Sequence, residues 1–167
     1  MVFLLDTSVV VACYKPGDPL HSSAVSLLRR GEMGFAVSPV GLFELYSVIS
    51  RLRSFIVVPD KFRGVSTDVL VRFIVRDLGL KLLASTLLVR HSGFKCRIPL
   101  EYYLSTVYSS RLRLRALDLL HIAYASILRE RVDAFITGDP EILEARDLIM
   151  REAGVRVKSP EEVLKGT

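Results

Sequence analysis

Four acidic residues stand in sequence contexts that an ordinary packed core does not favour. Asp6 and Asp139 each follow a strand-like apolar run, while Glu44 and Asp118 lie inside apolar helical stretches. Hard divalent cations prefer carboxylate oxygens, and acids gathered from separate elements suit metal-assisted attack on a phosphate. If the four carboxylates converge, we expect them to bind Mg²⁺ or Mn²⁺.

The first and last of these acids are placed by an α/β pattern. Asp6 follows residues 2–5 and Asp139 closely follows residues 134–137, and both runs begin with at least three consecutive apolar residues, as buried parallel strands do. Ligands of open parallel sheets bind beyond the carboxyl ends of the strands. A competing interpretation is that each aspartate only caps the next helix, and Pro140 favours this for Asp139. Both interpretations stay open for each residue taken alone.

The two helical acids are harder to explain as surface residues. Helical spacing places Glu44 beside Val40 and Val48, and it places Asp118 beside Ile122. A helix that is apolar nearly all round is buried, and an unpaired buried carboxylate is costly or becomes protonated. Each acid therefore needs a partner, which is either a metal ion or one of the many arginines of the chain.

Four ordered motifs resemble those of PIN-domain ribonucleases. They are LLDTS at 4–8, SPVGLFEL at 38–45, LDLLHIA at 117–123 and ITGD at 136–139. The chain is most similar to VapC-like toxins of toxin–antitoxin pairs, and the resemblance spans residues 1 to about 157. The resemblance implies that the metal-binding acids are Asp6, Glu44, Asp118 and Asp139. It implies that the hydroxyls of Thr137 and Thr7 support them.

The chain is expected to form one α/β domain over residues 1–167, with an extended helical middle at 55–99. The resemblance implies a three-layer α/β/α PIN-like fold with a five-stranded parallel sheet in the order 3-2-1-4-5. The expected strands are 2–5, 35–37, 95–98, 134–137 and 155–157. The main expected helices are 20–30, 39–53, 67–78, 80–91, 99–112, 117–129 and 140–153.

Charge favours an anionic partner. The formal net charge is +5 although the proposed site carries four acids, so the rest of the surface is more basic than the total suggests. Arg51, Arg113 and Arg115 flank the two acid-bearing helices and are candidate RNA contacts, because guanidinium groups grip phosphates bidentately. The competing interpretation of each is an ordinary solvated side chain.

Other sequence features argue for a cytoplasmic protein. Cys13 and Cys96 have no metal-type spacing and indicate reduced, packed cysteines. No leader is recognised, and no apolar run approaches the ~20 residues of a membrane helix. His121 lies one turn from Asp118, but a lone histidine on a buried helix is interpreted as a core or supporting group.

These observations predict a Mg²⁺- or Mn²⁺-dependent endoribonuclease. Asp6, Asp118 and Asp139 are expected to hold the ion, and Glu44 to complete the set or orient the attacking water. Hydrolysis in line would leave a 5′-phosphate and a 3′-hydroxyl without a covalent intermediate. The resemblance further implies a VapBC-type toxin with a small antitoxin whose tail lies across an apolar groove. A homodimer is expected through apolar segments such as 69–75 and 80–89.

Three alternatives remain. A solitary RNA-processing nuclease would use the same site without an antitoxin. A phosphatase using Asp6 as its nucleophile would need a second aspartate two residues later, where this chain has Ser8. A non-catalytic RNA-binding module usually loses part of the acid set, and none of the four acids is missing here.

Overall fold

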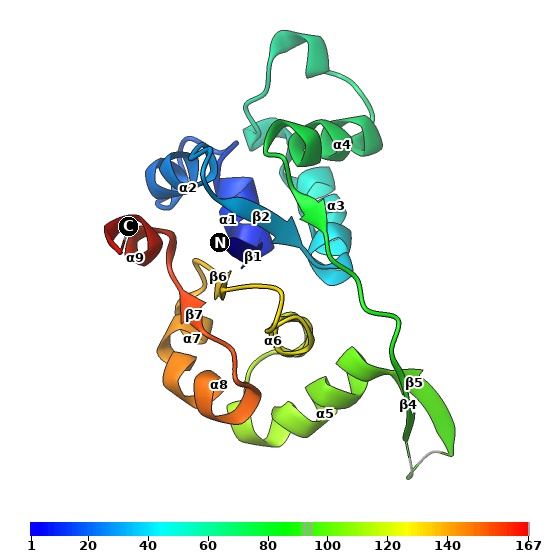
Figure 1. The fold of residues 1–167 in the computed structure, drawn as a ribbon. Coiled ribbons are helices and arrows are strands. Elements are labelled where there is room, and N and C mark those ends of the chain that lie inside the picture. Colours follow the sequence, from blue (N-terminus) through cyan, green and yellow to red (C-terminus); the bar gives the residue numbers. More distant parts are fainter. Residues whose placement is uncertain (92, 94, 167) are drawn as a thin grey trace.

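A parallel sheet forms the centre of the computed structural model, which describes residues 1–91, 93 and 95–166. Within these residues the sheet has five strands in the order β3-β2-β1-β6-β7, all paired in parallel (Figure 1). This confirms the expected sheet order. The strands are β1 (Val2–Leu5), β2 (Gly34–Val37), β3 (Lys81–Leu82), β6 (Ala134–Ile136) and β7 (Val157–Lys158).

Helices cover both faces of this sheet. One core packs the sheet against α1 (Thr7–Ala12), α2 (His21–Leu28), α3 (Pro39–Leu52) and α4 (Thr67–Asp77). The other packs it against α5 (Leu100–Leu112), α6 (Ala116–Ile127) and α8 (Arg146–Ala153). The expected three-layer α/β/α architecture is confirmed.

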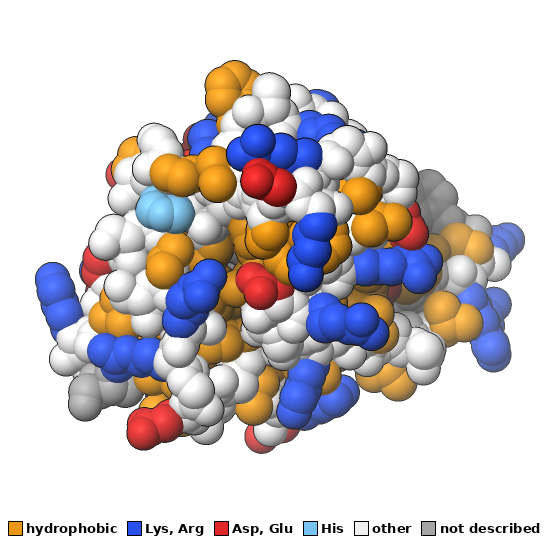
Figure 2. Space-filling model, turned by 90° about the horizontal axis from the view of Figure 1, so that it is seen from above, with side chains coloured by type: hydrophobic (Ala, Val, Ile, Leu, Met, Phe, Trp, Pro, Cys, Tyr) orange, Lys and Arg blue, Asp and Glu red, His pale blue; other side chains and the backbone are white. Residues whose placement is uncertain are grey.

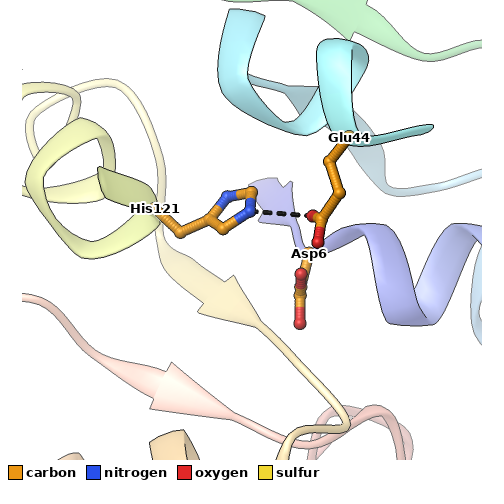
Figure 3. A group of neighbouring side chains, drawn as sticks. All are labelled: Asp6, Glu44 and His121. Atoms are coloured by element: carbon orange, nitrogen blue, oxygen red, sulfur yellow. Dashed lines mark hydrogen bonds and ion pairs between the residues drawn. The ribbon is translucent and has the colours of Figure 1, made fainter. Parts of the chain in front are cut away.

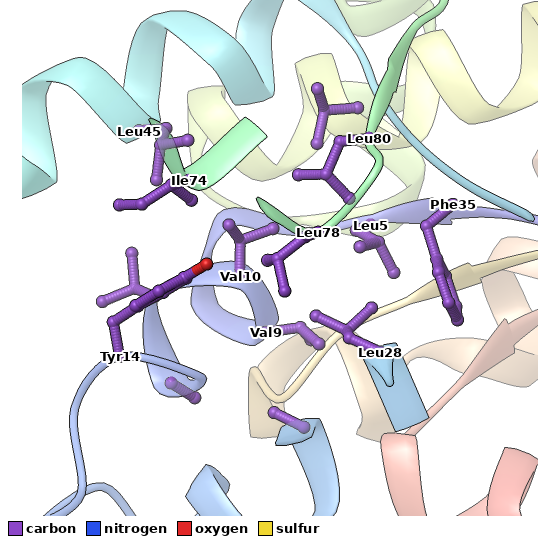
Figure 4. Close-up of a cluster of buried hydrophobic side chains, with 14 of the residues drawn as sticks. Leu5, Val9, Val10, Tyr14, Leu28, Phe35, Leu45, Ile74, Leu78 and Leu80 are labelled. Carbon is purple, nitrogen blue, oxygen red and sulfur yellow. The ribbon is translucent and has the colours of Figure 1, made fainter. Parts of the chain in front are cut away.

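Strand alternation explains the two cores. Phe3 and Leu5 point into the first core, and Leu4 between them points into the second. Because both faces are covered, the central strands β1 and β6 are apolar at every position rather than at every second one. Figure 4 shows Leu5 in the same buried cluster as Val9 of α1 and Leu28 of α2.

The predicted helix at 80–91 is wrong. Gly79 adopts a φ of 61° directly after α4, which ends the helix. The chain then pairs with β2 as β3, where Leu83 donates its N–H to the carbonyl of Val37. A short apolar run fits a strand as well as a helix, and here the open edge of β2 decides between them.

The predicted sheet strand at 95–98 is also wrong in its partner. β5 (Cys96–Pro99) pairs antiparallel with β4 (Leu88–His91) and forms a hairpin that projects from the body of the molecule (Figure 1). Its expected place in the sheet is taken by β3. The extended helical middle at 55–99 therefore consists of α4, a β-strand, a hairpin and two short 3₁₀ turns at Arg53–Phe55 and Asp60–Phe62.

Smaller differences lie near the C-terminus. The expected helix at 140–153 is two helices, α7 (Pro140–Glu144) and α8, joined at Ala145, whose ψ of 0° leaves the α-helical range. The last strand lies at Val157–Lys158 rather than at 155–157. An unexpected helix, α9 (Pro160–Lys165), begins with a capping box. No helix in the described part of the chain is long and apolar enough to cross a membrane.

Candidate metal centre

Two of the four acids meet at one edge of the sheet. β1 and β6 are adjacent and parallel, so the residues that follow them emerge side by side. Asp6 comes directly after β1, and its N–H donates to the carbonyl of Ile136 at the end of β6, over 2.8 Å. Asp139 follows β6 after two intervening residues and is the N-cap of α7.

Helices α3 and α6 carry further polar groups to this edge. Asp6, Glu44 of α3 and His121 of α6 each offer one ligand atom, and these atoms all lie within 4.8 Å of one another (Figure 3). Ser38 caps α3 by accepting a hydrogen bond from Gly41 N–H, which fixes where the helix begins. Three separate elements thus bring oxygen and nitrogen ligands to one point.

Two hydroxyls orient the Asp6 carboxylate. Asp6 is 7 % exposed, and its Oδ2 accepts hydrogen bonds from Thr137 Oγ1 (2.6 Å) and Ser8 Oγ (2.8 Å). Thr137 Oγ1 also accepts from Asp139 N–H over 3.0 Å, so one hydroxyl ties the two strand-end acids together. Asp6 makes no side-chain cap to α1, and the capping interpretation is therefore wrong for this residue.

His121 holds Glu44. Its Nε2 lies 3.0 Å from Glu44 Oε2, and its buried ring stacks on Phe135 with centroids 5.9 Å apart. Burial disfavours the Glu44 carboxylate, but the hydrogen bond with His121, the nearby Thr7 hydroxyl and the charge of Arg51 outweigh it and lower its pKa. Burial likewise opposes the charged imidazole, yet the bond to Glu44 and the surrounding acids raise the pKa of His121.

Asp118 has one carboxylate oxygen that lacks a hydrogen-bond partner in the described part of the chain. Its Oδ2 is buried and accepts no hydrogen bond from the described residues. Burial raises the pKa of Asp118, and the negative charges of Asp139 and Asp6 raise it further. A buried carboxylate oxygen that lacks a donor and faces other carboxylates is suited to a cation.

Asp139 has two roles in this arrangement. Its Oδ1 accepts the N–H of Glu141 over 2.8 Å, so the expected cap of α7 is present. Its charge also acts on Asp118, which places the same carboxylate beside the acidic cluster. Capping and membership of the cluster are compatible because a carboxylate has two oxygens.

The remaining predicted residues lie around this centre. Thr7 Oγ1 donates to the carbonyl of Gly41 and so connects α1 to α3. Asp118 and Asp139 lie outside the group that fits within 4.8 Å, although both interact electrostatically with it. Ser8 was missed as an orienting group, and its place two residues after Asp6 in the LLDTS motif was the available signal.

The three predicted arginines differ in their surroundings. Arg51 is exposed in the last turn of α3, where its charge reaches Glu44. Arg113 is exposed and closes α5 in a left-handed conformation, with a φ of 55°. Arg115 forms an ion pair with Glu141 at 2.7 Å, which bridges α6 and α7. Figure 2 shows further Lys and Arg side chains spread over the face that includes α2 and α4.

A PIN domain family model matches residues 3–148. The chain belongs to the PIN domain family. The matched region includes all four acids, each hydroxyl that orients them and His121. No curated protein matches the chain in sequence.

Solved structures resemble this PIN domain in fold. The VapC20 toxin of Mycobacterium tuberculosis, described as cleaving the sarcin–ricin loop, is 15 % identical with a TM-score of 0.56, covering 86 % of this chain and 94 % of its own. VapBC2 of Rickettsia felis, bound to a promoter DNA fragment, is 13 % identical with a TM-score of 0.55, covering 95 % and 98 %. PAE2754 of Pyrobaculum aerophilum is 15 % identical with a TM-score of 0.52, covering 99 % and 88 %.

The donor set of this PIN domain fits a hard divalent cation. The four carboxylates supply oxygen ligands, which Mg²⁺ and Mn²⁺ prefer. Among the described residues no donor meets the buried Oδ2 of Asp118, and burial together with the charges of Asp139 and Asp6 raises the pKa of this carboxyl even though His121 and Arg115 oppose the shift. His121 is already engaged with Glu44, so it fits a positioning role better than that of a ligand.

Proposed function

We propose that this PIN domain is a metal-dependent endoribonuclease. The main support is the group of acids at the carboxyl edge of the sheet, where Asp6 and Glu44 converge and Asp118 interacts with Asp6 and Asp139. RNA is favoured as the polyanion because the chain is basic and because the neighbour from M. tuberculosis is described as cleaving an RNA loop.

The chain's own residues have distinct roles in this proposal. Asp6, Asp118 and Asp139 would hold Mg²⁺ or Mn²⁺, and Glu44 would complete the set or orient the attacking water. The ion, when bound, supplies the charge that polarises the scissile phosphate and acidifies water. The lowered pKa of Glu44 keeps it ionised at neutral pH, so that it can accept a hydrogen bond from that water.

Cleavage of single-stranded RNA by the purified protein tests this proposal. We expect cleavage with Mg²⁺ or Mn²⁺, none with EDTA, and none with Asp118→Asn. Asp147→Asn is the matched control, because it removes the same charge from an exposed position on α8. Cleavage that persists in both EDTA and Asp118→Asn would contradict the proposal.

We also propose that the nuclease is the toxin of a toxin–antitoxin pair and forms a homodimer. The fold likeness to VapC20 and to a VapBC2 complex supports the pairing. A small antitoxin could place an arginine or lysine among the acids, where a fixed cation competes with the metal. Expression of this chain should arrest growth, and co-expression of its antitoxin should restore it.

A solitary processing nuclease is the second candidate, because a complete acid set serves either role. The growth experiment separates the two. If the chain cleaves RNA in vitro but its expression leaves growth unchanged, the toxin assignment falls and the processing nuclease replaces it.

A further inference from the structure

The β4–β5 hairpin and the segment that leads into it carry charge of one sign only. From Leu78 to Leu100 the sequence contains Lys81, Arg90, Lys95 and Arg97 and no acidic residue. Arg90, Lys95 and Arg97 are exposed and have no ion-pair partner among the described residues. Elsewhere, arginines such as Arg111, Arg115 and Arg146 are neutralised by nearby glutamates. The hairpin therefore carries charge that the fold leaves uncompensated.

Strand register places two of these charges directly opposite each other. Arg90 pairs with Arg97 across the hairpin, so both side chains project from the same face, together with exposed Leu88. Like charges directly opposite each other destabilise a pair of strands. The presence of Arg90 opposite Arg97 is therefore not explained by a contribution to the stability of the hairpin. The Cβ atoms of two residues paired in this way lie about 5 Å apart. Two guanidinium groups held so close together suit an anion with several phosphates.

The other face of the hairpin packs against α5. Val89, His91 and Ile98 alternate with the arginines and are partly buried. The His91 ring meets the edge of Tyr103 on α5 at a centroid distance of 6.1 Å. The hairpin thus has an inner face held by α5 and an outer cationic face turned to solvent.

Topology connects this face to the acidic centre. β3 is parallel to β2 and β1, so the chain leaves β3 at the same carboxyl edge at which Asp6 leaves β1, and then runs out to the hairpin (Figure 1). Figure 2 shows basic and hydrophobic side chains at the right-hand end of the molecule, where the hairpin lies in Figure 1. A long polyanion held by the hairpin can therefore extend toward the edge that carries the acids.

We propose that the outer face of the β4–β5 hairpin binds the phosphate backbone of single-stranded RNA. This rests on the proposed function, because it makes the hairpin the arm that holds the nuclease's substrate. A second copy of this chain is a poorer occupant, since a two-fold contact through this face would bring four unpaired arginines together. Tyr102, 54 % exposed in the first turn of α5, offers a ring for base stacking beside the arm.

The test measures binding of a labelled 20-nucleotide single-stranded RNA by the full chain in EDTA, so that cleavage does not interfere. Each phosphate contact on a single strand contributes about 0.7 to the slope of log affinity against log salt, or about fivefold at 0.1 M. Arg90→Gln/Arg97→Gln should therefore weaken binding about 25-fold and lower the slope by about 1.4. Arg90→Lys/Arg97→Lys should retain most of the slope.

The matched control is Arg131→Gln/Arg156→Gln. These two arginines are exposed and precede β6 and β7, so they lie at the amino ends of the strands, opposite the edge that carries the acids. The two substitutions remove the same net charge as those in the hairpin. We expect less than a twofold change in affinity. Thermal unfolding checks that the hairpin variant still folds, and its melting temperature should not fall, because a like-charge pair has been removed.

Each other outcome overturns a defined part of the proposal. Binding that is equal in the hairpin variant and the wild type, or no binding by the wild type, excludes the arm. An equal loss in the control shows a net-charge effect only. If the hairpin variant keeps RNA affinity but loses a co-expressed protein partner, the surface serves that partner instead. RNA binding through the hairpin without any cleavage removes the nuclease assignment and keeps the arm.

Discussion

At the scale of single residues, Asp118 differs most from the other acids. Its Oδ2 is buried and meets no donor from residues 1–91, 93 or 95–166, whereas Asp6 Oδ2 accepts two hydroxyl hydrogen bonds and Glu44 is held by His121. The pKa of Asp118 is raised by burial and by the neighbouring acids. Without metal this residue should therefore destabilise the fold.

Asp118→Asn should raise the stability of the metal-free protein, and the gain should depend on pH. A carboxyl whose pKa is raised by folding binds its proton more tightly in the native state, so its penalty appears as pH rises above the ordinary value near 3.8. Urea unfolding in EDTA from pH 4 to pH 8 measures the difference from wild type. A difference that stays constant with pH would contradict this account, and Asp147→Asn should show little change.

The His121 pair with Glu44 predicts a shift in the pH–rate profile. His121→Ala removes the hydrogen bond that holds down the pKa of Glu44, so the acid limb of kcat/KM should move to higher pH. We also expect about a 10- to 100-fold loss of activity, as for other residues that orient ligands.

The conservative variant His121→Gln separates positioning from packing. Glutamine can still donate to Glu44, so it should restore much of the acid limb even though the stacking on Phe135 is lost. An acid limb that is identical in wild type and His121→Ala would show that the pair is only structural.

At the scale of elements, the centre depends on a junction between β1 and β6. Thr137 is fully buried at the end of β6 and reaches both Asp6 and Asp139 N–H. In the register of the two strands Leu5 pairs with Ile136, so the next residues, Asp6 and Thr137, lie side by side. The parallel sheet therefore positions the acids before any ion is bound.

Thr137→Val tests this junction with little change in volume. It removes a donor to Asp6 and leaves Asp139 N–H without its acceptor, which should cost about 1–3 kcal/mol of unfolding free energy. Affinity for Mn²⁺ should fall about 10- to 100-fold. The control Thr106→Val loses only a hydroxyl that bonds within the exposed side of α5. Equal effects of the two variants would count against the junction.

The sequence predicted the elements that carry strong local signals. Asp6 and Asp139 could be placed because continuous apolar runs precede them, and Glu44 and Asp118 because helical spacing surrounds them with apolar residues. The missed helix α9 also had a signal, since Ser159 and Glu162 form a capping box.

The edge strand and the hairpin could not be predicted in the same way. β3 has two residues, both exposed, and exists because β2 offers an open edge. β5 pairs with β4 instead of joining the sheet, a choice decided by tertiary contacts with α5 rather than by local pattern. The distance from Glu44 to His121 likewise depends on how α3 and α6 pack.

At the scale of the whole molecule, an apolar groove remains open beside α3 and α4. Its volume is about 930 Å³, and Leu42, Tyr46 and Phe73 are among the residues that line it. Val69 (42 % exposed) and Leu82 (52 % exposed) also lie along it. Exposed apolar surface of this kind usually marks an interface, which supports the proposed homodimer.

Light scattering at micromolar concentration tests the dimer. We expect twice the monomer mass of 18.7 kDa for the wild type and a monomer for Val69→Asp/Leu82→Asp, because a charge in the groove would be desolvated on association. Met150→Asp, which alters an exposed apolar residue on α8, should remain dimeric. A monomeric wild type would remove the dimer from this account.

A crystal grown with Mn²⁺ tests the central claim most directly, because the anomalous signal locates the ion independently of activity. We predict a peak among Asp6, Glu44, Asp118 and Asp139, with carboxylate oxygens at about 2.0–2.3 Å. The peak should disappear in Asp118→Asn crystals grown in the same way. A Mn²⁺ peak elsewhere, with these four carboxylates bare, would contradict the account of this edge of the sheet as a metal centre.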